Sequence, residues 1–522
     1  MPQTKPRTPA AQGIRTASLP NTVQLQTLWT AIFNETPASA LAEMIPLARQ
    51  QRVQAWIFAQ PNYADLHLLL RHDAPKVRKN TARLLGQMQK SDDLPALTAS
   101  LAHEETLFVL PSLILAIGRF DDDEAKNALE RFSSRMAHFP ETVENKKHLD
   151  QIAQALKTAS QRFETLSPCS FTALPTDVVI HARAIKGCGA LLRQEALASG
   201  MKATLKKDTL VASPAQFLQT TQLRCAKDIL IPLSQNEPAP LFPAKAIDIQ
   251  NWVQSLTPAF LHFAALAKKA LRCERVHYRI ELQGIPHASR ASLAHEIVFC
   301  MNSIAPDLHN SNAHYHMELR IEYASLSQRA SIYARLFVPS DSRFAYRKQS
   351  LPASIHPVTA ASLMHFALPH LKKDAQVLDP CCGSGTLLIE RGMITPTKAL
   401  VGVDKDVHAI AIARENASHA NMPASFIAKK METFTPQEPF DEIIANLPFG
   451  TRVGTQQTIT AFHTELVKRL DVFLHAEGIA ILYSTQHRLL RQLAKRFGWH
   501  IVNEMPFPSG GLIPWGMILQ KP

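Results

Sequence analysis

The sequence has no apolar run of membrane-spanning length and few cysteines for its size. The seven cysteines are dispersed and form no C-x-x-C pair, which disfavours a zinc site, so we expect no metal. Unpaired cysteines are typical of a reducing compartment, and we expect a cytoplasmic protein with no membrane partner. Residues 1–21 lack acidic side chains and an apolar signal core, which predicts a disordered basic tail or, alternatively, an organellar transit peptide.

Acidic residues are also in the minority. The chain has 56 Lys and Arg against 44 Asp and Glu, a formal charge of +12. This excess favours a polyanionic partner such as nucleic acid, although a similar balance occurs in proteins that bind none. A chain of 522 residues is too long for one hydrophobic core and predicts about three domains.

A glycine-rich turn stands out in the C-terminal third of the chain. Apolar residues lead into Asp379, Gly383 and Gly385 lie in the turn, and helical apolar spacing begins at Thr386. Glycines at such a turn let the backbone approach a ligand, and the free N–H groups of the helix start favour polar or anionic groups. The pattern predicts a nucleotide-binding turn.

Two further apolar strands end in polar residues. One ends at Asp404, at the offset where a doubly wound sheet places a carboxylate on ribose hydroxyls, and the other ends at Asn446. Strands and helices alternate throughout, which predicts a parallel Rossmann-like sheet with its ligand at the carboxyl ends of the strands. The expected elements are 375–379, 386–392, 399–404, 407–419, 425–428, 441–446, 459–474, 479–483, 488–497, 499–505 and 516–520.

These three motifs resemble the signature set of class I S-adenosylmethionine (SAM) methyltransferases that methylate exocyclic amines. The first motif is most similar to that of the THUMP-bearing N2-guanosine RNA methyltransferases, and the resemblance covers residues 343–522. It implies SAM as cofactor and RNA as substrate, with tRNA preferred over ribosomal RNA. The implied cofactor-binding residues are Thr359, Asp379, Pro380, Cys381, Gly383, Gly385, Thr386, Asp404, Lys405, Lys430, Met431 and Asn446. Thr359 could instead cap the following helix, and Asp379 could be a capping aspartate.

The resemblance assigns the chemistry to residues 446–449. An exocyclic amine is conjugated with its ring and is a poor nucleophile, so the enzyme must orient it. The side-chain carbonyl of Asn446 and the backbone carbonyl of Leu447 would accept its two hydrogens, Pro448 would shape the turn, and Phe449 would stack on a flipped base. Geometry rather than a strong base then dominates the rate.

Two positions depart from the family pattern. Leu447 replaces the usual proline, and Lys430 replaces the usual aspartate for the adenine amine. Lys430 suggests an alternative to an active enzyme, namely an RNA-binding scaffold whose cofactor site has decayed. A third hypothesis keeps the fold and changes the acceptor to DNA adenine or a protein amide, because the Asn-x-Pro-aromatic motif also serves those amines.

Residues 22–165 predict a succession of amphipathic helices. Gly86 and Gly118 lie at similar places in two helical segments, and Asp92 and Asp93 are echoed by the acidic run 121–123. A unit as long as the separation between Gly86 and Gly118 resembles a HEAT-like repeat, and an ordinary helical bundle is the alternative. We expect this region to recruit a protein or RNA partner rather than to perform chemistry.

Short strands alternate with helices over residues 176–340, which predicts an α+β module. Segments 187–195 and 223–233 are similar to the ferredoxin-like domain of the THUMP methyltransferases, and the element order of 247–338 fits a THUMP-like RNA-binding domain. Basic and aromatic residues interleave here, as in an RNA surface or a solvated face: Lys202, Lys206, Lys207, Lys268, Lys269, Arg272, Arg275, His277, Tyr278 and Arg279.

A cationic bridge precedes the C-terminal domain. Arg343, Tyr346, Arg347 and Lys348 suit a clamp on the RNA backbone, or alternatively a solvent-facing linker. Arg224 falls where the family carries an arginine, and we expect it to contact RNA.

Overall fold

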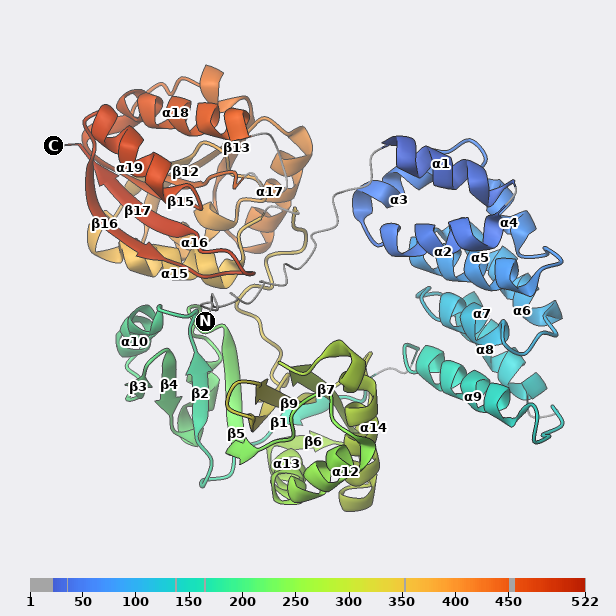
Figure 1. Ribbon diagram of the computed structural model, residues 1–522. Coiled ribbons are helices and arrows are strands. Elements are labelled where there is room, and N and C mark those ends of the chain that lie inside the picture. The colour runs from blue at the N-terminus through green and yellow to red at the C-terminus, as the bar shows by residue number, and fades with distance from the viewer. Residues whose placement is uncertain are drawn as a thin grey trace, which may run out of the picture. The chain divides into compact units, whose positions relative to one another are not determined.

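The computed structural model describes residues 22–34, 36–136, 139–163, 166–351, 354–449 and 456–521. The chain divides into two compact units, one formed by residues up to 166 with 311–314, and the other by 167–310 and 315–522 (Figure 1). The predicted basic tail, residues 1–21, lies outside the described residues. Among the described residues, no helix is long and apolar enough to cross a membrane.

The described part of the first unit is helical, as predicted, and has its own hydrophobic core. Pro46 lies inside a helix near its end, and prolines open several of the other helices, where their missing N–H groups cost nothing. The helices are α1 (Thr22–Ile32), α2 (Pro37–Leu47), α3 (Gln51–Phe58), α4 (Leu66–Leu69), α5 (Pro75–Met88), α6 (Leu94–His103), α7 (Leu110–Ile117), α8 (Asp123–Met136) and α9 (Lys146–Ser160).

Helices α2, α5, α7 and α9 pack on one another in succession (Figure 1). A Cβ atom added to Gly86 of α5 would lie 2.6 Å from the Cβ of Ala116 on α7. A Cβ atom added to Gly118, at the end of α7, would lie 2.5 Å from the Cβ of Ala159 on α9. The two glycines therefore make the same close helix contact one step apart, which explains their regular spacing in the sequence.

The middle of the chain forms one eight-stranded sheet with the order β3-β4-β2-β5-β10-β9-β7-β8. Strand β5 (Asp228–Pro238) pairs with β2 (Ile180–Arg183) on one side and with β10 (Arg329–Leu336) on the other. The two modules expected from the sequence therefore share a continuous sheet. The remaining elements are β3 (Thr204–Lys206), β4 (Thr209–Ala212), β7 (Val276–Gln283), β8 (Leu308–Asn310), β9 (Met317–Ala324), α10 (Gly189–Ala198), α11 (Phe217–Thr220), α12 (Ala246–Ser255), α13 (Thr257–Ala270) and α14 (His287–Ile304).

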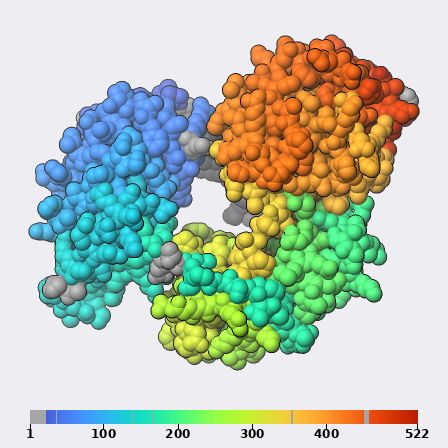
Figure 2. Space-filling view, turned by 180° about the vertical axis from the view of Figure 1, so that it is seen from behind, coloured from blue at the N-terminus to red at the C-terminus, as the bar shows by residue number. Residues whose placement is uncertain are grey.

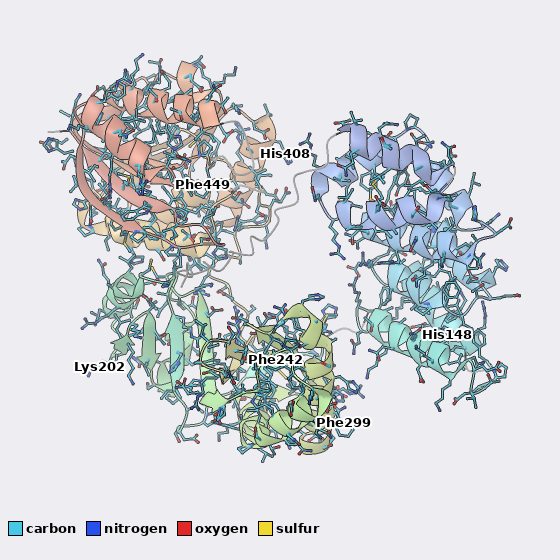
Figure 3. All side chains as sticks on the ribbon, viewed as in Figure 1. His148, Lys202, Phe242, Phe299, His408 and Phe449 are labelled. Atoms are coloured by element: carbon cyan, nitrogen blue, oxygen red, sulfur yellow. A yellow bond between two sulfur atoms is a disulfide. The ribbon has the colours of Figure 1, made fainter. Side chains whose placement is uncertain are left out.

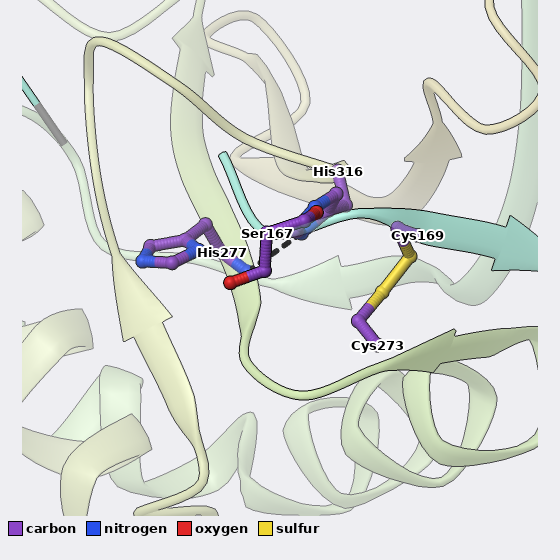
Figure 4. The surroundings of a disulfide bond; sticks show 5 residues. All are labelled: Ser167, Cys169, Cys273, His277 and His316. Carbon is purple, nitrogen blue, oxygen red and sulfur yellow. Dashed lines mark hydrogen bonds between the residues drawn. A yellow bond between two sulfur atoms is a disulfide. The ribbon is translucent and has the colours of Figure 1, made fainter. Parts of the chain in front are cut away.

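A disulfide bond joins Cys169 and Cys273 (Figure 4). These residues lie directly opposite each other on the antiparallel strands β1 (Cys169–Phe171) and β6 (Leu271–Cys273). The expectation that the cysteines stay unpaired is therefore wrong for this pair, because strand pairing brings together two residues 104 positions apart. The other five cysteines are free.

The C-terminal domain is a seven-stranded sheet with the order β13-β12-β11-β14-β15-β17-β16. Strands β11 to β15 run parallel, and β17 is antiparallel to β15. The strands are β11 (Ala375–Asp379), β12 (Thr397–Asp404), β13 (Ser425–Ala428), β14 (Phe440–Asn446), β15 (Leu474–Ser484), β16 (His500–Pro506) and β17 (Trp515–Gln520). The helices are α15 (Pro357–Ala367), α16 (Thr386–Ile394), α17 (Val407–His419), α18 (Gln456–Phe473) and α19 (His487–Arg496). The strand order reverses between β11 and β14, and ligands of doubly wound sheets bind at that point.

Candidate active site

The glycine-rich turn connects β11 to α16 at the switch point of the sheet. Gly383 and Gly385 adopt φ values of +50° and +77°, which favour glycine. A Cβ atom at Gly383 would meet only Leu351 Cδ1, at 3.9 Å, whereas one at Gly385 would lie 3.2 Å from Ala413 Cβ. Gly385 therefore permits close packing, and Gly383 leaves the loop open on one side.

Asp404 fixes this turn from the end of β12. Its Oδ2 accepts the N–H of Gly383 at 2.9 Å, and its Oδ1 accepts the N–H of Asp406 at 3.0 Å. The carboxylate is half-buried, and both of its oxygens are oriented by the backbone. The residue lies at the carboxyl end of its strand, as expected for a group that binds ribose hydroxyls.

Asp379 is a fully buried carboxyl at the end of β11. Its Oδ1 accepts the N–H of Cys381 at 3.1 Å, and among the described residues no lysine or arginine forms an ion pair with it. Burial, with a smaller contribution from the negative charge of Asp404, raises the pKa of Asp379 to about 8. A buried carboxyl without a cationic partner suits a ligand that brings its own positive charge.

Asp379→Asn is expected to flatten the pH dependence of stability. The folded pKa of about 8 exceeds the ordinary value of 3.8, so the proton bound by the folded state stabilises it. That contribution is complete below the unfolded pKa and is lost as the pH rises through about 8. Between about pH 6 and about pH 9, thermal unfolding of the ligand-free protein should show a larger loss for the wild type than for the variant. The exposed Asp374→Asn is the control, and identical profiles for wild type and Asp379→Asn would refute the assignment.

The Asn446–Phe449 segment follows β14, next to the turn. The Cys381 thiol lies 3.7 Å from the backbone carbonyl oxygen of Asn446, and the N–H of Leu447 donates to the carbonyl of Tyr483 at 2.9 Å. The rings of Phe449 and Tyr483 are 5.6 Å apart between centroids. Phe449, labelled in Figure 3, therefore has an aromatic neighbour on β15 that holds one side of its ring.

The remaining expected cofactor residues fall into two groups. Pro380, Thr386 and Thr359 are buried around the turn, and the Thr386 hydroxyl lies 3.2 Å from that of Ser384. The helix cap next to Thr359 is His356, whose Nδ1 accepts the N–H of Val358, so the alternative that Thr359 caps this helix is wrong.

Residues 405, 430 and 431 lie farther along the strand ends. Lys405 and Lys430 are exposed, whereas Met431 is buried in the core beneath β14. Lys430 precedes a short 3-10 turn, and its carbonyl accepts the N–H of Phe434 at 3.1 Å. Because its side chain faces solvent, Lys430 does not fill the space next to Asp404.

Three of the five residues expected to contact RNA instead join the middle sheet to the C-terminal domain. Arg224 makes two hydrogen bonds to Glu390 of α16, at 2.9 and 2.7 Å, and the Tyr346 hydroxyl donates to the same carboxylate at 2.6 Å. The buried Arg343 donates to the carbonyls of Leu223 and Ala226. Figure 2 shows a yellow stretch of chain between the green and orange regions. Hydrogen bonds within the chain engage these three side chains. Binding RNA through the same groups would require breaking the joint.

The other two cationic residues keep free donors. Arg347 is half-buried, its Nε makes no hydrogen bond, and burial lowers the pKa of its guanidinium. Lys348 is exposed. The expected clamp therefore reduces to Arg347 and Lys348.

A buried contact between a histidine and a serine, not expected from the sequence, lies behind the Asn446–Phe449 segment. His463 Nδ1 lies 2.9 Å from the carbonyl of Ile459, and its Nε2 lies 3.0 Å from the Ser484 hydroxyl. A carbonyl only accepts, so Nδ1 carries the proton and Nε2 accepts from Ser484. The bond holds α18 against the end of β15. No local pattern marks these residues, because the contact depends on tertiary packing.

Two clusters of possible metal ligands occur among the described residues: Cys169, Cys273 and His316, and Glu195, Cys225 and His365. In the first, the cysteines form the disulfide, and His316 accepts the N–H of His277 and donates to the carbonyl of Ser167 (Figure 4). In the second, both oxygens of Glu195 accept backbone N–H groups. Hydrogen bonds or the disulfide therefore occupy most of these ligand atoms.

The C-terminal domain matches a known protein family. Residues 345–514 match the model of the family UPF0020, "RMKL-like, methyltransferase domain". The C-terminal domain is a class I methyltransferase domain. Its strand order and the turn between β11 and α16 agree with this family match.

The curated relatives match only part of this chain, and the match covers only part of each relative. A tRNA (guanine(6)-N2)-methyltransferase of Methanocaldococcus jannaschii is 23% identical over 208 residues, 32% of this chain and 54% of the relative. A ribosomal protein L11 methyltransferase of Pseudomonas fluorescens is 32% identical over 151 residues, 28% of this chain and 49% of the relative. The chain thus spans about half the length of these relatives. The crystal structure of TrmN from Thermus thermophilus is 19% identical, with a TM-score of 0.48, over 66% of this chain and all of that one.

The methyltransferase domain uses SAM, and the residues at the switch point fit this cofactor. The buried Asp379 could receive the ammonium group of the methionine moiety, Gly383 leaves its loop open on one side, and the oriented carboxylate of Asp404 could accept ribose hydroxyls. The exposed Lys430 leaves the adenine amine without an acidic partner at that position.

Proposed function

We propose that the chain is a SAM-dependent RNA methyltransferase that forms N2-methylguanosine, with tRNA preferred over ribosomal RNA. The observation that carries the proposal is the contact between the two motifs, in which the Cys381 thiol touches the Asn446 carbonyl at 3.7 Å. In the proposal, the segment that orients the amine therefore lies beside the turn that binds the cofactor. The guanine-N2 activity named for the relative from Methanocaldococcus jannaschii supports guanine as the base.

The cofactor supplies an electrophilic methyl group on a sulfonium. Asn446 Oδ1 and the Leu447 carbonyl accept the two N–H hydrogens of the guanine amine and direct its nitrogen at the methyl carbon. Phe449, held by Tyr483, stacks on the flipped base. Bound SAM would supply the methyl carbon and a neutral thioether leaving group, and the amine held by Asn446 and Leu447 would release its proton to solvent. Orientation contributes most of the rate, and the thiols of Cys381 and Cys382 form no covalent bond.

The cations near this site supply RNA contacts in the proposal. Arg347 is half-buried and Lys348 is exposed, so their accessible N–H groups can bind phosphate next to a flipped nucleotide. We further infer that residues 176–340 are a ferredoxin-like and THUMP-like RNA-binding region. The repeated glycine contacts at Gly86 and Gly118 support HEAT-like repeats over residues 22–165.

The test compares acceptors. The full chain is incubated with labelled SAM and unmodified tRNA, ribosomal RNA, duplex DNA or ribosomal protein, and the nucleosides are identified by mass spectrometry. We expect label in RNA, as N2-methylguanosine, and most of it in tRNA. Label only in DNA or protein would overturn the proposal, and the L11 methyltransferase relative makes the protein acceptor the informative alternative.

Calorimetry with SAM separates an active enzyme from a scaffold with a decayed site. Binding heat is expected, because Asp379, Gly383 and Asp404 keep their arrangement and Lys430 faces solvent. A silent titration would favour the scaffold.

A further inference from the structure

Four exposed arginines belong to the stacked helices of the first unit. Arg49 follows α2, Arg83 lies in the second half of α5, Arg119 follows α7, and Arg162 follows α9. Each helix of the stack, or the turn that follows it, thus contributes one of these four guanidinium groups. We call these four residues the arginine ridge.

Hydrogen bonds link members of the arginine ridge to the preceding helix of the stack. Arg119 Nη1 donates to the carbonyl of Gly86 at 3.2 Å and to Gln87 Oε1 at 2.9 Å. Arg162 Nη1 donates to the carbonyl of Gly118 at 3.2 Å. These acceptors are neutral, so the hydrogen bonds position the guanidinium groups without neutralising their charge.

The other three ridge arginines lie close enough to Arg119 for their charges to act on it. The pKa of Arg119 is lowered, first by partial burial of its guanidinium group and then by the positive charges of Arg162, Arg49 and Arg83. Among the described residues, no aspartate or glutamate forms an ion pair with any member of the ridge. Like charges gathered without counter-ions destabilise a fold unless a ligand compensates them.

Capping of the helix ends does not require these charges. At the same end of the stack, Gln54 Nε2 donates to the carbonyl of Ala48 at 2.8 Å, and Gln89 Nε2 donates to the carbonyl of Arg119 at 2.5 Å. Neutral amides therefore satisfy helix-end carbonyls here as well as arginine does. Capping therefore does not account for the positive charge of the ridge, whereas binding of an anionic partner would.

We propose that the arginine ridge binds the phosphate backbone of the RNA substrate. Guanidinium groups bind phosphates through paired N–H donors, and neighbouring packed helices lie about 8–10 Å apart, so the ridge offers a row of cations to a polymer of regularly spaced anions. The ligand class, RNA, rests on the proposed function. The ridge is a second RNA contact, formed by residues far in sequence from the methyltransferase domain.

The test replaces the four ridge arginines by glutamine in the full chain and measures tRNA binding against salt. Each phosphate contact contributes about 0.7–0.9 to the slope of log K against log salt concentration, so the slope should become shallower by about 3. Glutamine keeps an amide donor at each position without the charge, and unfolding curves check that the variant still folds. The charge-matched control replaces the exposed residues Lys76, Lys126, Arg131 and Lys147 by glutamine and should shift the slope far less.

The outcomes separate the ridge from the proposed function. An unchanged slope in the ridge variant, with methyl transfer to RNA intact in the wild type, overturns the ridge and leaves the function standing. A shallower slope without methyl transfer to any RNA supports the ridge and overturns the function. Normal RNA binding together with lost binding of an acidic polypeptide such as polyglutamate would assign the ridge to a protein partner and overturn the proposal.

Discussion

Asn446→Ala is expected to lower the rate of methyl transfer by about 100-fold to about 1000-fold, the range found when one preorganised hydrogen-bonding group is removed from an active site. The substitution removes an acceptor that orients the amine, while the Leu447 carbonyl and Phe449 remain. Single-turnover rates at saturating RNA and SAM measure this effect. Calorimetry with SAM shows whether Asn446 also binds the cofactor, as the resemblance implies, because Asp379, Gly383 and Asp404 are untouched.

Asn446→Asp serves as the matched variant because it keeps an acceptor oxygen at the same place. Its rate should exceed that of Asn446→Ala. A wild-type rate in the alanine variant would remove Asn446 from the chemistry and would redirect attention to the backbone carbonyl of Leu447. Asn503→Ala, an exposed asparagine on β16, controls for nonspecific effects.

Arg391→Met is expected to destabilise the methyltransferase domain by about 3–5 kcal/mol, as is typical when one partner of a buried ion pair is removed. Arg391 of α16 and Glu442 of β14 are both fully buried and make two hydrogen bonds, at 2.6 and 2.9 Å. Arg391 also donates to the carbonyls of Lys372 and Thr395. The substitution leaves the Glu442 carboxylate buried without its cation.

Denaturant unfolding of the full chain, followed by tryptophan fluorescence, measures this loss. The double variant Arg391→Met with Glu442→Gln should recover part of the stability, because no charge is then left unpaired. The exposed pair of Lys146 and Glu141 gives the contrast, and Lys146→Met should leave the unfolding curve nearly unchanged. Equal losses of stability in Arg391→Met and Lys146→Met would show that burial of an ion pair does not determine how much its removal destabilises the protein.

Alternating apolar and polar segments made the methyltransferase domain predictable from sequence. The bounds of β11, α17 and β13 agree with the expected ranges, because a polar residue or proline lies within two positions of both ends of each element. The start of β15 was missed. The strand begins at Leu474, but the exposed residues His475 and Glu477 interrupt the apolar pattern.

Contacts between distant parts of the chain could not be predicted. The role of β5 as the shared strand of the middle sheet and the bond between Cys169 and Cys273 depend on tertiary pairing. Arg224 was expected to contact RNA because the family carries an arginine there, and Tyr346 because a cluster with Arg347 and Lys348 suits a clamp on the RNA backbone. Sequence shows the charge of a side chain but not whether a buried carboxylate such as Glu390 already binds it.

The carboxylate of Glu390 sets a limit on how this protein can be divided. A fragment starting at residue 343 would keep the Tyr346 hydroxyl but lose Arg224, the cation that balances Glu390. A sequence boundary between domains is therefore not a safe cleavage point. The piece from residue 167 onward keeps both halves of the joint and contains the whole second unit, together with residues 311–314 of the first.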